Sequence, residues 1–284
     1  MMHQEFKWQL KSGEITLGRD PLVMGILNVT PDSFSDGGDF TDRDMIVAQA
    51  QKMVAEGADI LDIGGESTRP GSEAVAAQEE LDRVLPAIDA LKESGITTPI
   101  SIDSYKAIVG QQAMEAGAEI INDVWGFQRD PELADVAAHY GCPSILMHWD
   151  PDRDREKDLI GEMNRFFEKS LQIAENAGIS KSQIALDPGF GFAKNFDENY
   201  ELLRRVDELH ALGYPLLIGT SRKSMFGKLL GNTPKERVAA TAASTVLAYE
   251  KGAHIFRVHD VRENLDALHV VKAMLYGPPP PKDV

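Results

Sequence analysis

At 284 residues and 43% hydrophobic content, the chain can bury one sizeable core, and α/β barrels of about this size commonly form a single domain. The formal net charge of -16 and an isoelectric point near 4.8 argue against a broad nucleic-acid-binding face and against binding to anionic membranes, because both need clustered Lys and Arg. The single cysteine, Cys142, cannot form an intramolecular disulfide and is weak evidence for a thiolate metal site, so we interpret it as a packed small hydrophobe rather than a nucleophile.

The N-terminal residues predict a short β-hairpin outside the main fold. Residues 3–18 alternate polar and apolar side chains around Ser12 and Gly13, the pattern of two short strands and a turn. Residues 1–10 lack the continuous apolar core of a signal peptide, and no stretch of the chain approaches the ~18 apolar residues of a membrane-spanning helix. The sequence therefore predicts a soluble, cytoplasmic protein.

Eight strand-helix units follow the hairpin. Each has a short apolar run, a polar or Gly-rich segment and a stretch of helical periodicity, the order expected of a parallel sheet. The apolar runs are residues 22–27, 59–63, 100–102, 119–121, 144–147, 184–186, 216–218 and 255–258. Helices are predicted at residues 43–56, 77–94, 104–116, 131–140, 157–177, 197–212, 233–251 and 262–275.

Eight such units without an inserted domain favour a closed (β/α)8 barrel over a doubly wound open sheet, which shares the same alternation. We expect residues 1–284 to form one domain, with residues 1–18 as a hairpin that covers the bottom of the barrel. Residues 277–284, which include the run Pro278–Pro281, are expected to be a flexible extended tail.

Polar side chains stand at the carboxyl ends of the predicted strands. In a (β/α)8 barrel these ends surround one mouth, and active sites form there. The polar residues at these positions are Asn28, Asp62, Asp103, Asn122, Asp123, His148, Asp187, Ser221, Lys223, Arg257 and His259. We interpret the set as the candidate active site.

Several of these residues also have a purely structural interpretation. Asn28, Asp103 and Asp123 could each cap the helix that follows, and Asp103 could both cap and bind a ligand. Asp62 lies between buried apolar neighbours, so a structural hydrogen bond inside the barrel is an equal alternative to catalysis. For His148 the structural role is preferred.

The predicted mouth is basic although the chain is acidic. Five basic residues lie in or beside the strand-end loops: Arg69, Arg222, Lys223, Arg257 and His259. An anionic substrate group is the simplest reason for them. The segment Ser67–Gly71 supplies hydroxyl groups, an Arg and turn residues together, which are groups that hold phosphate-type anions. A solvated loop is the alternative for any one segment.

The segment 186–192 (LDPGFGF) predicts a site for a flat ring. Its Pro and two Gly shape a tight turn, and its two Phe remain to cover a planar ligand. Asp187 could pair with the edge of an amino-heterocycle, while Lys223, Asn122 and Asp103 could add hydrogen bonds around the same ring.

Seven segments at the predicted strand ends form an ordered set: residues 24–38 (MGILNVTPDSFSDGG), 62–71 (DIGGESTRPG), 101–104 (SIDS), 122–124 (NDV), 187–192 (DPGFGF), 221–224 (SRKS) and 257–261 (RVHDV). Together they resemble the dihydropteroate synthase family of pterin-binding barrel enzymes, which belong to the folate pathway, and the resemblance spans residues 22–275. It implies condensation of 6-hydroxymethyl-7,8-dihydropterin diphosphate with 4-aminobenzoate to give 7,8-dihydropteroate and diphosphate.

The resemblance also implies roles for individual residues. The pterin pocket would comprise Asp103, Asn122, Asp187 and Lys223, lined by Met147, Phe192 and Gly219. The diphosphate site would use Asn28, Thr68, Arg69, Arg257 and His259, with Mg2+ bridging Asn28 and the diphosphate oxygens. The 4-aminobenzoate would lie near Phe34, Pro70, Phe192, Lys223 and Ser224. The catalytic residues would be Asp103, Lys223, Arg257 and Arg69.

The implied mechanism is a dissociative substitution. Mg2+, Arg69 and Arg257 would spread the charge of the departing diphosphate. The cation left on the pterin methylene would delocalise into the ring near Asp103, and the neutral aniline nitrogen would attack it. Such a reaction needs no covalent enzyme intermediate and therefore no Ser or Cys nucleophile.

One segment departs from the family pattern. After Met147 the family often has small and Gly-Pro-containing residues, whereas residues 149–158 (WDPDRDREKD) are heavily charged. We interpret this as ordinary loop variation, and the alternative is an effect on dimer contacts or on access of the ring. The family is typically homodimeric, and residues 233–275 are the candidate interface by the resemblance alone.

Two other functions are kept as alternatives. A corrinoid-dependent methyltetrahydrofolate methyltransferase binds a related ring but has no diphosphate to hold, so the segments Ser67–Gly71 and Arg257–His259 argue against it. A catalytically silent pterin-binding paralogue would keep affinity for pterin and would not release diphosphate.

Overall fold

Eight parallel strands form the centre of the structure, a computed structural model that describes residues 3–30, 42–67 and 74–281. They are β3 (Leu22–Asn28), β4 (Ile60–Gly64), β5 (Ile100–Asp103), β6 (Ile120–Asp123), β7 (Ser144–Met147), β8 (Ile184–Asp187), β9 (Leu217–Ile218) and β10 (Ile255–Val258). They pair in the order β8-β7-β6-β5-β4-β3-β10-β9, and a parallel bridge between Leu186 and Leu216 joins the two ends. The sheet is therefore the predicted closed barrel, and the open-sheet alternative is wrong.

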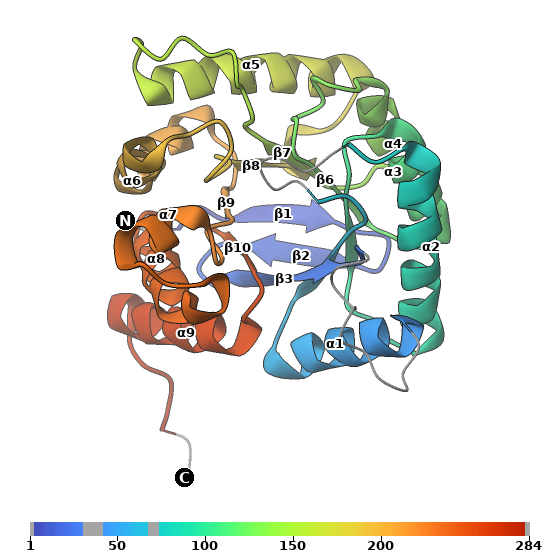
Figure 1. Ribbon diagram of the computed structural model, residues 1–284, viewed down its shortest axis with the longest axis horizontal. Coiled ribbons are helices and arrows are strands. Elements are labelled where there is room, and N and C mark those ends of the chain that lie inside the picture. Colours follow the sequence, from blue (N-terminus) through green and yellow to red (C-terminus); the bar gives the residue numbers. More distant parts are fainter. Residues whose placement is uncertain (1–2, 31–41, 68–73, 282–284) are drawn as a thin grey trace.

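Helices lie between successive strands and surround the barrel (Figure 1). In the described residues the α-helices are α1 (Asp42–Glu56), α2 (Ala77–Glu93), α3 (Ala107–Ala116), α4 (Glu132–Tyr140), α5 (Leu159–Ala177), α6 (Phe196–Arg205), α7 (Ser224–Leu230), α8 (Val238–Glu250) and α9 (Val261–Tyr276). Short 3-10 helices are η2 (Lys181–Gln183), η3 (Val206–Leu212) and η4 (Pro234–Glu236). None of the helices among the described residues is long and apolar enough to cross a membrane.

The helix predicted at residues 104–116 begins later, at Ala107. The backbone N–H of Ser104 donates to the carbonyl of Asn122 over 3.1 Å, so this segment still follows the neighbouring strand. Lys106 is extended, with φ −96° and ψ 125°, and precedes the first helical residue. Lys106 makes no side-chain cap, and the N–H of Ala107 donates to Asp130 Oδ2 over 2.8 Å, so the alternative that Asp103 caps this helix is wrong.

The helices predicted at residues 197–212 and 233–251 are each interrupted. Arg205 (φ −112°, ψ 8°) and Arg237 (φ −89°, ψ 12°) leave the α conformation, and the backbone beside them tightens into η3 and η4. The prediction omits α7, because seven residues carry too little helical periodicity to stand out from a loop.

The N-terminal hairpin closes one end of the barrel. Strands β1 (Phe6–Gln9) and β2 (Glu14–Leu17) pair antiparallel, and Figure 1 shows them across the centre of the ring of helices. Trp8 is fully buried, and it clusters with inward-pointing residues near the strand starts: Leu22, Met24, Ile60, Ile120, Ile145, Ala185, Leu217 and Ile255. The predicted lid is confirmed, and the carboxyl ends of the strands form the opposite end of the barrel.

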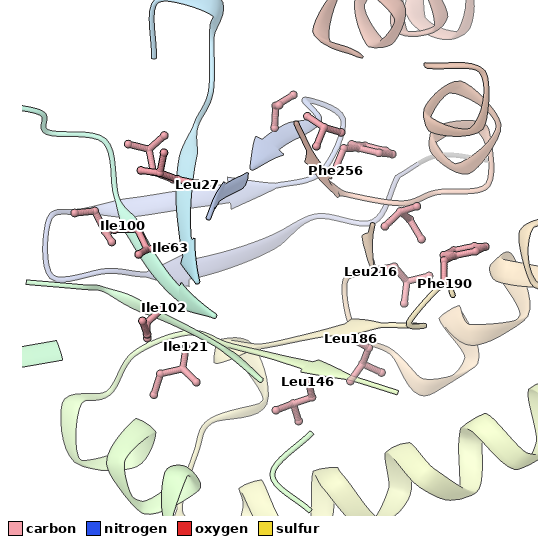
Figure 2. Packing of buried hydrophobic residues seen from close by; sticks show 14 of the residues in the cluster. Leu27, Ile63, Ile100, Ile102, Ile121, Leu146, Leu186, Phe190, Leu216 and Phe256 are labelled. Carbon is pink, nitrogen blue, oxygen red and sulfur yellow. The ribbon is translucent and has the colours of Figure 1, made fainter. Parts of the chain in front are cut away.

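Apolar side chains also fill the layer between the barrel wall and the helices. Leu27, Ile63 and Ile102 belong to this cluster (Figure 2). Residues of the surrounding helices belong to it as well. Strands that are buried on both faces read as continuous apolar runs, which is why the sequence located them well. Cys142 is part of the same cluster, and burial raises the pKa of its thiol to about 12, as expected for a packed hydrophobe.

A buried imidazole joins the N-terminal segment to the barrel. His254 Nδ1 accepts a hydrogen bond from the N–H of Leu216 over 3.3 Å, so Nε2 carries the proton and donates to the carbonyl of Gln4 over 3.0 Å. Burial lowers the pKa of His254 to about 4. A second proton, on Nδ1, would point at the N–H of Leu216, so the folded state holds this imidazole neutral.

Acidification should therefore destabilise the protein through His254. An unfolded His has a pKa near 6.5, so between pH ~6.5 and the folded pKa the unfolded state binds more protons. The free energy of unfolding, measured by urea titration, should lose about 3 kcal/mol from this group between pH 7 and pH 4. His254→Gln removes the titration and should flatten that part of the profile. Parallel profiles for the two proteins would contradict the assignment.

Candidate active site

Carboxylate and amide side chains from neighbouring strands meet at the open end of the barrel. Asp62 lies on β4, Asp103 ends β5, Asn122 lies on β6 and Asp187 ends β8, and all four are buried. Asn122 Nδ2 donates to both Asp62 oxygens, over 3.2 Å and 3.4 Å. The sequence placed these residues at one mouth, and the structure brings them together there.

Arg257 of β10 bridges two of these carboxylates. Its Nε donates to Asp62 Oδ2 and its Nη2 donates to Asp103 Oδ2, each over 2.6 Å. Burial lowers the pKa of Arg257, but Asp62 and Asp103 outweigh it, and the net shift is upward. The structural hydrogen bond expected of Asp62 is present. Nη1 makes no hydrogen bond within the described part of the chain, so this edge of the guanidinium remains for another acceptor.

Asp103 has one paired and one unpaired oxygen. Its Oδ1 is buried and has no hydrogen-bond partner in the described ranges, while Oδ2 accepts from Arg257. Burial raises the pKa of Asp103 to about 7, with Arg257 acting against the shift and Asp62 adding to it. A buried oxygen without a partner costs free energy, which a ligand with a hydrogen-bond donor or a positive charge would recover.

The turn after β8 holds Asp187 and Lys223 close to each other. The N–H of Gly189 donates to Asp187 Oδ1 over 2.7 Å, and Lys223 Nζ donates to the carbonyl of Phe190 over 2.5 Å. Gly189 has φ +67°, and a Cβ there would lie 2.2 Å from the carbonyl oxygen of His148, so only glycine fits.

Burial raises the pKa of Asp187 and lowers that of Lys223 to about 8, although their attraction opposes both shifts. Lys223 Nζ also lies 4.2 Å from the centre of the Phe192 ring. Gly219 leaves room beside this pair, since a Cβ on it would lie 3.8 Å from Asp187 Oδ2 and 4.0 Å from Cβ of Arg257. These contacts bring an acidic, a basic and an aromatic side chain together at the mouth of the barrel.

The rim beside β9 and β10 is less basic than the sequence suggested. Arg222 forms a two-point ion pair with Asp260, so its charge is engaged at the rim and is not directed at an anion. Ser221 Oγ lies 2.9 Å from His259 Nδ1 and also accepts from the N–H of His259 over 3.1 Å. Ser221 thereby orients the predicted anion-binding imidazole.

Comparison with known proteins decides the family. A sequence model described as pterin binding enzyme matches residues 24–259. The dihydropteroate synthases of Clostridium beijerinckii and Bacillus subtilis are 48% and 46% identical to this chain, covering 90% and 93% of it and 95% and 92% of their own sequences. The chain belongs to the dihydropteroate synthases, within the pterin-binding enzyme family.

Solved structures of this family are also similar. The dihydropteroate synthase of Clostridium difficile, crystallised in the presence of pteroic acid, has a TM-score of 0.88 at 48% identity and covers 92% of this chain and 98% of its own. That of Xanthomonas albilineans with 4-aminobenzoic acid has a TM-score of 0.90 at 43% identity and covers 97% and 100%.

Of the remaining predicted residues of this synthase, the structure describes some and leaves four outside its described ranges. Met147 is buried and Phe192 half-buried, and both belong to one aromatic cluster at the mouth. Asn28 ends β3 and Ser224 begins α7. Four predicted residues lie outside the described ranges: Phe34, Thr68, Arg69 and Pro70.

Asp123 and His148 have structural contacts in this synthase. Asp123 accepts from the backbone N–H groups of Trp125 and Phe127, each over 2.7 Å, and so shapes the turn after β6 instead of capping a helix. His148 is fully buried, and its Nδ1 lies 3.0 Å from Lys194 Nζ. The preference for a structural His148 agrees with these contacts.

The charged segment 149–158, which follows β7, contacts the turn after β8 and the first turn of α6. Arg155 donates to the carbonyl of Ala193 over 3.2 Å and to Glu198, and Arg153 is buried in an ion pair with the same Glu198. Trp149 packs on Phe192 with 5.0 Å between ring centres. The segment therefore holds the turn after β8, which neither sequence interpretation of this departure described.

The sequence pattern did not predict an ion cluster next to β4, formed by Lys106, Glu66 and Glu80. Lys106 pairs with both Glu66 and Glu80, and Tyr105 donates to Glu66 over 3.4 Å. Glu80 is buried, and burial raises its pKa against the effect of Lys106. These residues are 26 and 40 positions apart in the chain, so no local charge pattern could have paired them.

Proposed function

We propose that this chain condenses 6-hydroxymethyl-7,8-dihydropterin diphosphate with 4-aminobenzoate and releases diphosphate and 7,8-dihydropteroate. The observation that carries the proposal is the arc of Asp103, Asn122, Asp187 and Lys223 at one barrel mouth, in a chain of the dihydropteroate synthase family. Solved relatives from Xanthomonas albilineans hold 4-aminobenzoic acid and 7,8-dihydropteroate, the second substrate and the product of this reaction.

The arc suits a pterin ring. Asp187, held by the N–H of Gly189, would accept from the amino edge of the ring, and Lys223 and Asn122 would donate to its acceptors. Phe192 and Met147 would line the ring faces. Asp103 would contact the ring through Oδ1, because Oδ2 accepts a hydrogen bond from Arg257.

The diphosphate would lie on the other side of the mouth. Arg257, whose Nη1 has no hydrogen-bond partner among the described residues, and His259, oriented by Ser221, are the described groups that would receive it. Asn28, Thr68 and Arg69 complete this proposed site. Arg257 then contacts both the leaving group and Asp103, which couples the two halves of the site.

The residues near Asn28 fit Mg2+. A Cβ on Gly64 would lie 3.7 Å from Asn28 Oδ1 and 3.5 Å from Asp103 Oδ2, so glycine leaves a space bordered by two oxygens. Amide, carboxylate and diphosphate oxygens form the kind of ligand set that Mg2+ prefers. Asn28 is the residue that would hold the ion, which when bound would supply positive charge to offset the charge that develops on the leaving group.

The chain's own residues would then carry the reaction. Arg257 stabilises the departing diphosphate, whose loss leaves a cation delocalised over the pterin. The Asp103 carboxylate stabilises that cation from its buried position. The amine of 4-aminobenzoate attacks the methylene carbon as a neutral nucleophile and loses its proton to solvent. No side chain forms a covalent bond to substrate.

A product assay tests the proposal. The protein is mixed with Mg2+, the pterin diphosphate and 4-aminobenzoate, and dihydropteroate and diphosphate are measured together. We expect equimolar formation of both. Pterin binding without diphosphate release would instead indicate a silent binding paralogue, and methyl transfer from methyltetrahydrofolate to a corrinoid would indicate the methyltransferase.

Loss of the Asn28 amide should lower the affinity of the enzyme for Mg2+ and leave pterin binding unchanged. Asn28→Ala should raise the Mg2+ concentration for half-maximal rate at least about tenfold, since even indirect supports of a metal site contribute this much. Affinity for a pterin without diphosphate should stay unchanged. Asn176→Ala, on the exposed side of α5, is the matched control. An unaltered Mg2+ dependence in Asn28→Ala would remove this residue from the metal site.

We further propose a homodimer formed through α7, α8 and α9. Large apolar side chains are exposed on these helices, among them Leu229 (57%), Leu247 (47%), Val270 (72%) and Met274 (63%). Sedimentation velocity should give a dimer, and Val270→Glu combined with Met274→Glu should give a monomer. A monomeric wild-type protein would contradict the proposal.

We also propose that the enzyme works in the cytoplasm. The one cysteine is buried and needs no oxidising compartment, in agreement with this location. Cell fractionation followed by the product assay tests it.

A further inference from the structure

The turn between β8 and α6 contains one residue, Ala193, in a conformation that its side chain disfavours. Gly189 and Gly191 have positive φ, and Ala193, a residue with a Cβ, also has φ +49°. A left-handed conformation costs a non-glycine residue roughly 1–2 kcal/mol. Side-chain hydrogen bonds to the backbone of the turn help to offset this cost.

Lys194 supplies the most central of these contacts. It is 9% exposed, which is unusual for a lysine, and its Nζ lies at the centre of the turn. Nζ donates to the carbonyls of Gly189 over 3.0 Å and Phe192 over 3.1 Å, and lies 3.0 Å from His148 Nδ1. An ammonium has three N–H groups, and here each has an acceptor.

This arrangement tolerates loss of the proton. Burial lowers the pKa of Lys194 to about 7, and burial also lowers the pKa of His148. A neutral amine would keep its two hydrogen bonds to the carbonyls and would accept from His148 with the proton on Nδ1. Asp187, Lys223, Arg153 and Glu198 are the other charged groups that act on Lys194.

Neighbouring groups complete the attachment of the turn. Asn199 of α6 accepts from the N–H of Gly191 over 2.6 Å and donates to the carbonyl of Lys194 over 3.2 Å. Arg155 donates to the carbonyl of Ala193 over 3.2 Å. The two carbonyls that Lys194 binds lie at the two ends of the segment 189–192. The N–H of Phe192 also donates to the carbonyl of Gly189 over 3.1 Å, so Lys194 reinforces a turn that its own backbone hydrogen bond closes.

Three groups of the proposed pterin pocket depend on this segment. The N–H of Gly189 orients Asp187, the carbonyl of Phe190 receives Lys223 Nζ, and the Phe192 ring lies against the same Nζ. We propose that Lys194 is a positioning residue for recognition of the pterin ring, fixing residues 189–192 so that Asp187, Phe192 and Lys223 face one ligand. The inference rests on the proposed function, because it assumes that the pterin lies in this arc.

Lys194→Met tests the role, because Met has a similar length and no N–H group. The KM for pterin diphosphate and the Kd of 6-hydroxymethylpterin should both rise on the order of 10- to 100-fold, as for the loss of hydrogen bonds to a charged group. The KM for 4-aminobenzoate should rise less than these two quantities, because Phe192 and Lys223 also border its expected site but Asp187 contacts only the pterin. Lys251→Met, which removes an ion pair to Asp207 remote from the mouth, is the control for a general loss of stability.

The result separates positioning from folding. A merely structural Lys194 would lower the melting temperature and kcat and would leave pterin KM and Kd at wild-type values, which would overturn the proposal. If Lys194→Met does not fold, Lys194→Gln, which can donate to one of the two carbonyls, is measured with the same expected split. A wild-type protein without synthase activity would instead refute the proposed function, so the two failures are distinguishable.

Discussion

Asp187→Asn should weaken binding of a pterin that lacks the diphosphate by about 100-fold, the cost of losing a hydrogen-bonded charge in a buried site. The geometry adds a reason. Asp187 Oδ1 accepts from the N–H of Gly189, so the amide oxygen of the variant keeps that position. Its NH2 group then replaces Oδ2 on the side of Gly219, and two donors would face each other at the amino edge of the ring.

Isothermal titration with 6-hydroxymethylpterin, and separately with its diphosphate, gives the required affinities. The loss should be similar for both ligands, because the altered contact is to the ring. Asp207→Asn, in an ion pair with Lys251 away from the mouth, controls for the charge change. Wild-type affinity for the ring alone in Asp187→Asn would place the pterin elsewhere.

The sequence predicted the barrel because local signals repeat along the chain. Each buried parallel strand reads as an apolar run, and each helix carries its own periodicity, so eight units could be counted without any knowledge of contacts. The short helix α7 and the 3-10 segments η3 and η4 were missed for the same reason, because one or two turns of helix leave no repeat to detect.

The membership of the mouth was predictable, but its pairing was not. Strand ends converge in any (β/α)8 barrel, so Asp62, Asp103 and Arg257 could be assigned to one site by position alone. Their ion pairs join residues 195 and 154 positions apart, and nothing local indicates which charges meet. Arg222 shows the consequence, since it was counted toward an anion site and is instead paired with Asp260.

Lys194 and the segment 149–158 show a second limit of sequence reasoning. A lysine after a glycine-rich turn has the composition of a solvated loop, and so does a run of alternating charges. Both are structural here because the folded turn presents carbonyl groups, those of Gly189, Phe192 and Ala193, to which Lys194 and Arg155 donate. Only the folded backbone reveals these acceptors.

Arg257→Ala should lower kcat/KM about 10³-fold, the usual cost of removing a donor that stabilises developing negative charge. It should also destabilise the fold by about 3–5 kcal/mol, because it leaves Asp62 and Asp103 buried without their cation. Arg257 lowers the pKa of Asp103, so its removal should move that pKa upward from about 7 and shift the acidic limb of the kcat/KM profile to higher pH.

The pH dependence separates the two roles of Arg257. Near pH 7 the variant should bind even the pterin without diphosphate more weakly, because Asp103 is then protonated. Near pH 9 that ligand should recover affinity as Asp103 ionises, whereas the pterin diphosphate should stay weakly bound because its own cation is missing. Asp62→Asn, which removes one carboxylate and retains Arg257, should lower the pKa of Asp103 instead, since Asp62 raises it. Equal losses for both ligands at both pH values would show that Arg257 supports the barrel mouth without contacting the anion.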